Sequence, residues 1–129
     1  MRVLVIDGQG GGLGRQLVTA ITALCPEVEL TAVGTNSMAA SAMLKAGAAR
    51  AATGENGVIS PIGIVIADAL LGEITPAMAA AICQADAKRV LIPVNHCENF
   101  VVGVPEGPVS QLVQTAAQKV KELCTTGCK

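Results

Sequence analysis

The feature that most constrains the fold is an apolar segment that runs into a glycine-rich loop near the start of the chain. Residues 3–6 are Val-Leu-Val-Ile, Asp7 follows them, and residues 8–14 contain five glycines. A buried strand that leads through such a loop into a helix allows backbone N–H groups and the helix N-terminus to approach a phosphate group. The stretch therefore predicts a strand, a ligand-binding loop and a helix, with a nucleotide or another phosphorylated molecule as the ligand.

The rest of the chain alternates between short apolar segments and segments with helical spacing of apolar residues. Ser60-Pro61 and Thr75-Pro76 each have the signature of an N-cap followed by proline at the first helical position. Strands are predicted at residues 2–7, 28–34, 48–53 and 89–94, and helices at residues 12–25, 38–46, 61–71, 76–83 and 108–123. This alternation predicts an α/β fold, a single three-layer Rossmann-like domain over residues 1–123 with a mostly parallel sheet, followed by a polar tail at 124–129.

Two connections are too short for a parallel crossover, which needs a dozen or more residues. Residues 54–57 separate the segment 48–53 from Val58 and Ile59. Either Asn56-Gly57 forms a hairpin turn there, or one of the two segments lies outside the main sheet. The connection at residues 95–99 is equally short, which predicts that residues 100–104 form an antiparallel edge strand.

The spacing of the glycines distinguishes several kinds of phosphate-binding loop. The dinucleotide-binding spacing G-x-G-x-x-G is met at Gly8 and Gly10 but has Leu13 in the third place. The G-x-x-x-G-x-G spacing of short-chain dehydrogenases is met in full, but their Tyr-x-x-x-Lys acid is excluded because the chain has no tyrosine. A P-loop is disfavoured because Arg15 and Gln16 stand where its lysine and its magnesium-binding hydroxyl belong.

The segment after the second predicted strand bears on the kind of nucleotide. NAD-binding proteins place an acidic residue there for the ribose hydroxyls, whereas this chain has Thr35-Asn36-Ser37. Such side chains can hydrogen-bond a ribose or a phosphate without repelling it, so NAD(P) or another nucleotide fits, with Arg15 or Lys45 as the charge partner. The predicted binding residues are Asp7, Gly8, Gln9, Gly10, Gly11, Gly12, Leu13, Gly14, Arg15, Thr35, Asn36, Ser37, Pro61 and Asn95.

His96, Cys97 and Asp7 are the candidate catalytic residues. The His96-Cys97 pair could supply a general base, a metal ligand or a nucleophile, and the alternative is an ordinary polar loop, because adjacent residues on an extended chain point apart. Asp7 either accepts hydrogen bonds from N–H groups of its own loop or contacts a ligand hydroxyl or a metal. Cys124 and Cys128 could join His96 and Cys97 at a zinc site. The sequence lacks a second closely spaced cysteine pair of the kind that zinc-binding motifs contain, so no metal is predicted.

Charge and hydropathy exclude two classes of partner. The net charge is −1, the basic residues are scattered and only 1% of the residues are aromatic, so we expect no nucleic-acid binding. The longest apolar stretch, residues 58–71, is interrupted by Pro61 and Asp68, and it is shorter than the roughly 20 residues of a membrane-spanning helix. We therefore expect no membrane partner and a cytoplasmic protein.

The cysteines and the low share of charged residues lead to two further expectations. An odd number of cysteines, five, indicates reduced thiols rather than a disulfide framework. Cys25 and Cys83 have apolar neighbours at helical spacing and are predicted to be buried. Because 51% of the residues are hydrophobic and only 15% are charged, a second subunit is expected to cover some helix faces, giving a homo-oligomer such as a dimer.

Several short motifs resemble a known family over nearly the whole chain. They are Val5-Ile6-Asp7-Gly8-Gln9-Gly10-Gly11-Gly12, Gly34-Thr35-Asn36, Met43-Leu44-Lys45-Ala46-Gly47-Ala48, Thr53-Gly54-Glu55-Asn56, Gly72-Glu73-Ile74-Thr75-Pro76 and Ile92-Pro93-Val94-Asn95. In these motifs the chain resembles a family of short bacterial proteins known only as a domain of unknown function. The resemblance implies a compact Rossmann-like protein and brings no activity, substrate or catalytic residue with it.

Taken as a whole, the sequence favours a small cytoplasmic nucleotide- or dinucleotide-binding protein that acts as a sensor or accessory module. Two alternatives stay open. One is an enzyme that acts on a nucleotide-linked or phosphorylated substrate through His96 or Cys97, and the other is a structural or interaction protein whose loop binds no ligand.

Overall fold

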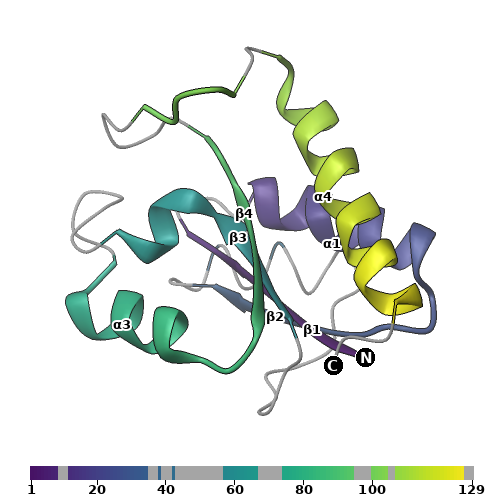
Figure 1. Cartoon of the computed structure of the whole chain (residues 1–129), viewed down its shortest axis with the longest axis horizontal. Helices are drawn as coiled ribbons and strands as arrows, with labels where there is room; N and C mark the ends of the chain where they lie inside the picture. Colours follow the sequence, from purple (N-terminus) through teal and green to yellow (C-terminus); the bar gives the residue numbers. More distant parts are fainter. Residues whose placement is uncertain are drawn as a thin grey trace.

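A parallel β-sheet with helices packed against it forms the centre of the molecule (Figure 1). The computed structural model describes residues 1–8, 12–34, 38, 42, 57–66, 74–94, 100–104 and 107–126. The mixed α/β class expected from the alternation of segments is confirmed.

The sheet contains four described strands in the order β2-β1-β3-β4. They are β1 (Arg2–Asp7), β2 (Glu29–Gly34), β3 (Gly57–Pro61) and β4 (Lys88–Ile92), and every pair of neighbours is parallel. Asp7 lies opposite Gly34, and Pro61 lies opposite Ile92. The carboxyl ends of the strands therefore share one edge of the sheet.

Helices α1 (Gly12–Leu24) and α4 (Val109–Thr125) cover one face of the sheet (Figure 1). Their apolar residues recur at helical spacing, so each helix has a continuous buried stripe. The core on this face includes Val3, Val5, Leu17, Ile21, Leu30, Ile92, Val113, Ala117 and Val120. This shared core holds α1 and α4 against each other and against the sheet.

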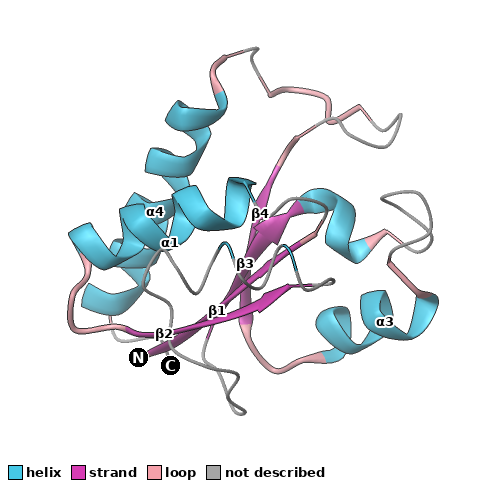
Figure 2. Ribbon diagram, turned by 180° about the vertical axis from the view of Figure 1, so that it is seen from behind, coloured by secondary structure: helices cyan, strands magenta, loops and turns pink. Residues whose placement is uncertain are grey.

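A smaller core lies on the opposite face, between the sheet and α3 (Pro76–Gln84), next to the 3-10 helix η1 (Ile62–Val65) (Figure 2). It contains Ile6, Ile74 and Ala79. Successive residues of a strand point to opposite faces of a sheet, so β1 supplies both cores. A strand covered on both faces explains its nearly unbroken apolar sequence.

Most of the predicted elements are confirmed within the described residues. The strand at 2–7, the helix after the glycine loop, the strand ending at Gly34 and the last helix all form close to their predicted bounds. The strand expected at 89–94 occupies Lys88–Ile92 and stops before Pro93, which lacks an N–H group to donate. Residues 38 and 42 are helical, as the helix predicted at 38–46 requires.

Of the two segments on either side of residues 54–57, the one that contains Val58 and Ile59 lies in the main sheet. Both residues belong to β3, which pairs in parallel with β1 and with β4. The strand expected at 48–53 lies outside the described residues.

Two predicted elements are wrong. Pro61 ends β3 instead of starting an α-helix. Ile62–Val65 form the 3-10 helix η1 in its place, because Gly63 and the β-branched residues beside it are poor helix formers. Residues 67–71 of the expected helix lie outside the described residues. Residues 100–104 form no strand. Gly103 adopts a positive φ of 86° in a turn there, so the chain bends where the antiparallel edge strand was expected.

Two smaller differences concern cysteines. Cys83 is predicted to be buried but is exposed, and it lies one residue before the end of α3, where the helix leaves the smaller core. Cys124, expected in the polar tail, belongs to α4, which continues to Thr125. Cys25 is buried as predicted. Among the described helices, none has the length and apolar character needed to cross a membrane.

Candidate functional site

The predicted binding loops all begin at the carboxyl edge of the sheet. The register places the last residues of β1 and β2 side by side, and likewise those of β3 and β4. The structure describes Asp7, Gly8, Gly12, Leu13, Gly14, Arg15 and Pro61 of the predicted set. Gln9, Gly10, Gly11, Thr35, Asn36, Ser37, Asn95 and the catalytic candidates His96 and Cys97 lie outside the described residues.

Asp7 organises the described part of the glycine loop. Its carboxylate is buried, and it accepts a hydrogen bond from the Gly8 N–H on Oδ1 at 2.8 Å and one from the Gly14 N–H on Oδ2 at 2.6 Å. Gly14 lies in the first turn of α1, where N–H groups have no acceptor within the helix. The carboxylate also places a negative charge at the positive end of the helix dipole. Of the two roles weighed for Asp7, bonding to its own loop is therefore observed.

Gly12 stands at the first position of α1 and is exposed. A Cβ atom added there would meet no atom within 4 Å, and Gly103 is the described glycine with a positive φ. Neither close packing nor a left-handed backbone therefore requires glycine at position 12. The space beside it is open to an incoming group.

An open groove of about 370 Å³ runs between α1 and α4 and begins beside the first turn of each helix. Arg15, Gln16 and Thr19 line it on α1, and Ser110, Val113 and Gln114 line it on α4. The Arg15 side chain is exposed, and its guanidinium makes no hydrogen bond or ion pair with the part of the chain that the structure describes. A positive charge is thus available three residues after Gly12.

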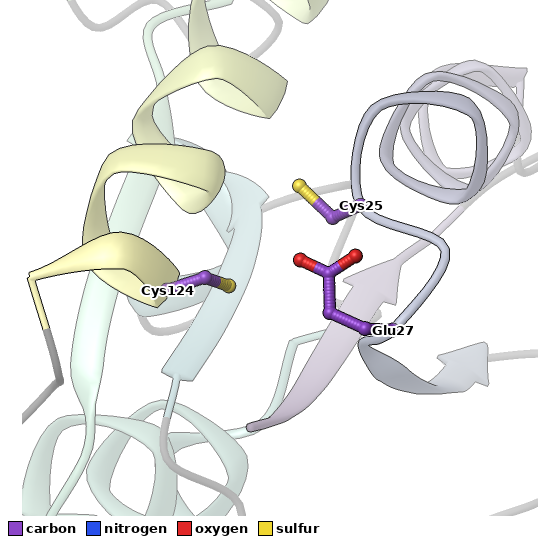
Figure 3. A group of neighbouring side chains, drawn as sticks. All are labelled: Cys25, Glu27 and Cys124. Carbon is purple, nitrogen blue, oxygen red and sulfur yellow. The ribbon is translucent and has the colours of Figure 1, made fainter.

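Sequence reasoning missed two polar features. Ser60 is fully buried one residue before the end of β3, and its Oγ has no hydrogen-bond partner among the described residues. At the opposite edge of the sheet, Cys25, Glu27 and Cys124 gather with their side chains directed toward one another (Figure 3). The sequence predicts Cys25 only as a small buried hydrophobic residue, because no local pattern links it to Cys124, which lies almost at the other end of the chain.

Comparisons with known proteins agree with the motifs noted in the sequence. A family model described as Domain of unknown function (DUF3842) matches residues 2–125. No curated protein and no solved structure shows a significant match.

Proposed function

Because the chain belongs to this family of unknown function, we propose its role from its own geometry: it is a small nucleotide- or dinucleotide-binding protein that acts as a sensor or accessory module. The ligand's phosphates lie beside the N-terminus of α1. The thiols of Cys25, Cys83 and Cys124 support a reducing compartment such as the cytoplasm.

The observation that supports this proposal most strongly is the glycine at position 12. A glycine costs conformational entropy when it is ordered, so its presence at a helix start usually has a packing or conformational reason. Neither reason applies to Gly12, since a Cβ atom would meet nothing within 4 Å and its φ is not in the left-handed region. The close approach of a ligand to the backbone supplies the missing reason.

The hydrogen bonds of Asp7 refine where a phosphate would lie. Its carboxylate already accepts from the N–H groups of Gly8 and Gly14, and its negative charge would repel a phosphate placed directly over them. The N–H groups of Gly12 and Leu13 also lack acceptors within the helix. We therefore assign the phosphate to Gly12 and Leu13, with the Arg15 guanidinium as its charge partner.

The order of the described strands supports the same location. An order β2-β1-β3-β4 reverses direction between β1 and β3, and open α/β sheets bind ligands at such a switch point, outside the carboxyl ends of the strands. We propose a three-layer Rossmann-like arrangement with the ligand between the loop after Asp7 and the turn after Pro61. The cores on the two faces of the sheet support this arrangement.

The test is a thermal-shift measurement with a panel of mononucleotides and dinucleotides on the wild type, on Gly12→Val and on the control Gly107→Val. Gly107 also precedes a helix, and its added Cβ would meet only the flexible end of Gln111 at 3.4 Å. A ligand at a hundredfold excess over its Kd stabilises the folded state by about 2.7 kcal/mol, which raises the Tm of a chain of this size by about 10 °C.

We expect at least one nucleotide to raise the Tm of the wild type and of Gly107→Val. Gly12→Val should keep its unliganded Tm, because its side chain has room, and should lose the shift. If no nucleotide stabilises the wild type, the proposal is wrong. If Gly12→Val responds as strongly as the wild type, the phosphate does not lie at Gly12.

We also propose that the chain forms a homodimer through an apolar arm, the exposed residues Phe100, Val102 and Val104 of the described segment 100–104. Phe100 and Val102 are 85% and 96% exposed, Val104 on the same segment is 38% exposed, and Val109 at the start of α4 is 40% exposed. Phe100 is the only aromatic residue of the sequence. Exposed apolar residues grouped on one segment are typical of an interface with another protein chain.

A further inference from the structure

Cys25, Glu27 and Cys124 form a group at the amino edge of the sheet, opposite the glycine loop (Figure 3). Cys25 follows directly after α1, Glu27 lies in the turn before β2, and Cys124 lies in the last turn of α4. The two sulfur atoms and a carboxylate oxygen of Glu27 all lie within 4.8 Å of one another. Three potential metal ligands from distant parts of the sequence thus share one small space.

The backbone fixes the position of each of these residues. The Cys25 N–H donates to the carbonyl of Ile21 at 2.8 Å, and the Val28 N–H donates to the carbonyl of Cys25 at 3.0 Å, which closes the turn that contains Glu27. Cys124 is held by α4, which shares the main core with α1. The group is therefore arranged by the fold itself, before any metal binds.

The side chains are those that zinc prefers in proteins, since Zn²⁺ binds cysteine sulfur and carboxylate oxygen in tetrahedral sites. With Zn–S bonds of about 2.3 Å, ligand atoms around a tetrahedral ion are about 3.8 Å apart. The observed ligand atoms all lie within 4.8 Å of one another, so each pair has to approach by no more than about 1 Å to reach that separation. We propose that Cys25 Sγ, Cys124 Sγ and the Glu27 carboxylate bind one Zn²⁺ ion, with the fourth position open to water.

Binding requires both thiols to lose their protons. Burial raises the pKa of the Cys25 thiol above its ordinary value of 9.0, the Cys124 and Glu27 charges raise this pKa further, and nearby Lys121 lowers it. Zn²⁺ therefore replaces one proton on each sulfur, two Zn–S bonds form, and two protons pass to solvent.

The oxygen ligand distinguishes zinc from other soft cations. Cu(I) prefers sulfur ligands alone, and the Met1 Sδ lies 3.2 Å from the Cys124 Sγ, so Cu(I) would take Met1 in place of Glu27. Mg²⁺ and Ca²⁺ prefer oxygen ligands throughout. Dependence of binding on Glu27 is thus the property that assigns the site to zinc. The proposal is independent of nucleotide binding, because the two sites lie at opposite edges of the sheet.

The experiment uses the full chain, reduced and freed of metal with a chelator, and titrates Zn²⁺ in competition with a coloured zinc indicator. We expect one equivalent of Zn²⁺ to bind to the wild type. Cys124→Ser should weaken binding at least about a hundredfold, and Glu27→Gln about tenfold or more, the range over which removed ligands and their supporting contacts act. The matched control Cys83→Ser removes an exposed thiol from α3 and should bind as the wild type does.

A second measurement guards against variants that fail to fold. Co²⁺ in place of Zn²⁺ gives a thiolate-to-metal charge-transfer absorption, which should weaken in Cys124→Ser while circular dichroism shows a folded protein. Glu27 is exposed, so Glu27→Gln should fold normally and report only on binding. The proposal is overturned if the wild type binds no stoichiometric Zn²⁺, if Cys124→Ser binds as tightly as the wild type, or if Glu27→Gln leaves Zn²⁺ affinity unchanged.

Discussion

At the scale of single residues, Asp7 gives the clearest prediction for stability. In Asp7→Asn, one of the two carboxylate oxygens becomes an NH₂ group, which cannot accept from the N–H of Gly8 or Gly14. One buried N–H is then left without an acceptor, and a charge-assisted hydrogen bond is lost. We expect the free energy of unfolding to fall by about 2 kcal/mol, measured by urea denaturation of the ligand-free protein.

Asp86→Asn is the control, because Asp86 is exposed just beyond α3. It should change the free energy of unfolding by less than about 0.5 kcal/mol. If Asp7 served mainly to contact a ligand, Asp7→Asn would leave the ligand-free protein as stable as the wild type and would weaken only binding. That result would contradict the structural role that its hydrogen bonds indicate.

The roles of some of these residues could be predicted from their neighbours in the sequence, and the roles of others could not. Asp7 and Gly12 could be selected because a strand, a carboxylate and a run of glycines follow one another in the chain. Ser60 could not, since nothing in its neighbours reveals that it is fully buried. Cys25 was correctly predicted to be buried, but its chemical partners come from Glu27 and from Cys124, and only the fold brings Cys124 near.

At the scale of secondary-structure elements, the start of α3 depends on one side chain. The Thr75 Oγ1 accepts a hydrogen bond from the Met78 N–H at 3.2 Å, and Pro76 occupies the first helical position. Thr75→Ala should lower the free energy of unfolding by about 1 kcal/mol, whereas Thr75→Ser keeps the hydroxyl and should stay within about 0.5 kcal/mol of the wild type. Chemical denaturation of the three proteins measures both values, and equal losses in Ala and Ser would show that the cap contributes nothing.

Ser60-Pro61 has the same signature, an N-cap residue followed by proline, but it does not start the helix expected there. The difference between the two sites lies in their surroundings. Thr75 is exposed and leads into a helix with one side in solvent. Ser60 is buried and pairs with Leu91 across β3 and β4. Pairing with distant strands determined the structure at Ser60, and such pairing leaves no trace in the residues that immediately follow it. A capping signature therefore predicts a helix only where the chain is free of a sheet.

At the scale of the whole molecule, the edge on which the loops meet was predictable but the arrangement of the strands was not. Alternating strands and helices imply parallel pairing, and parallel strands place their carboxyl ends together. The order β2-β1-β3-β4 depends on contacts between segments far apart in sequence. For the same reason the group of Cys25, Glu27 and Cys124 emerged only from the structure, where parallel packing of α1 and α4 places their last turns side by side.

The last prediction concerns the oligomeric state. A stable interface usually buries about 1,600 Å² with apolar side chains at its centre, and Phe100 and Val102 are the most exposed of the large apolar residues that the structure describes. We expect light scattering after size exclusion to show a dimer for the wild type and a monomer for the double variant Phe100→Ser/Val102→Ser. Met38→Ser is the matched control, because Met38 is also exposed, at 69%, but belongs to a different segment. A monomeric wild type, or a double variant that stays dimeric, would show that the arm is not the interface.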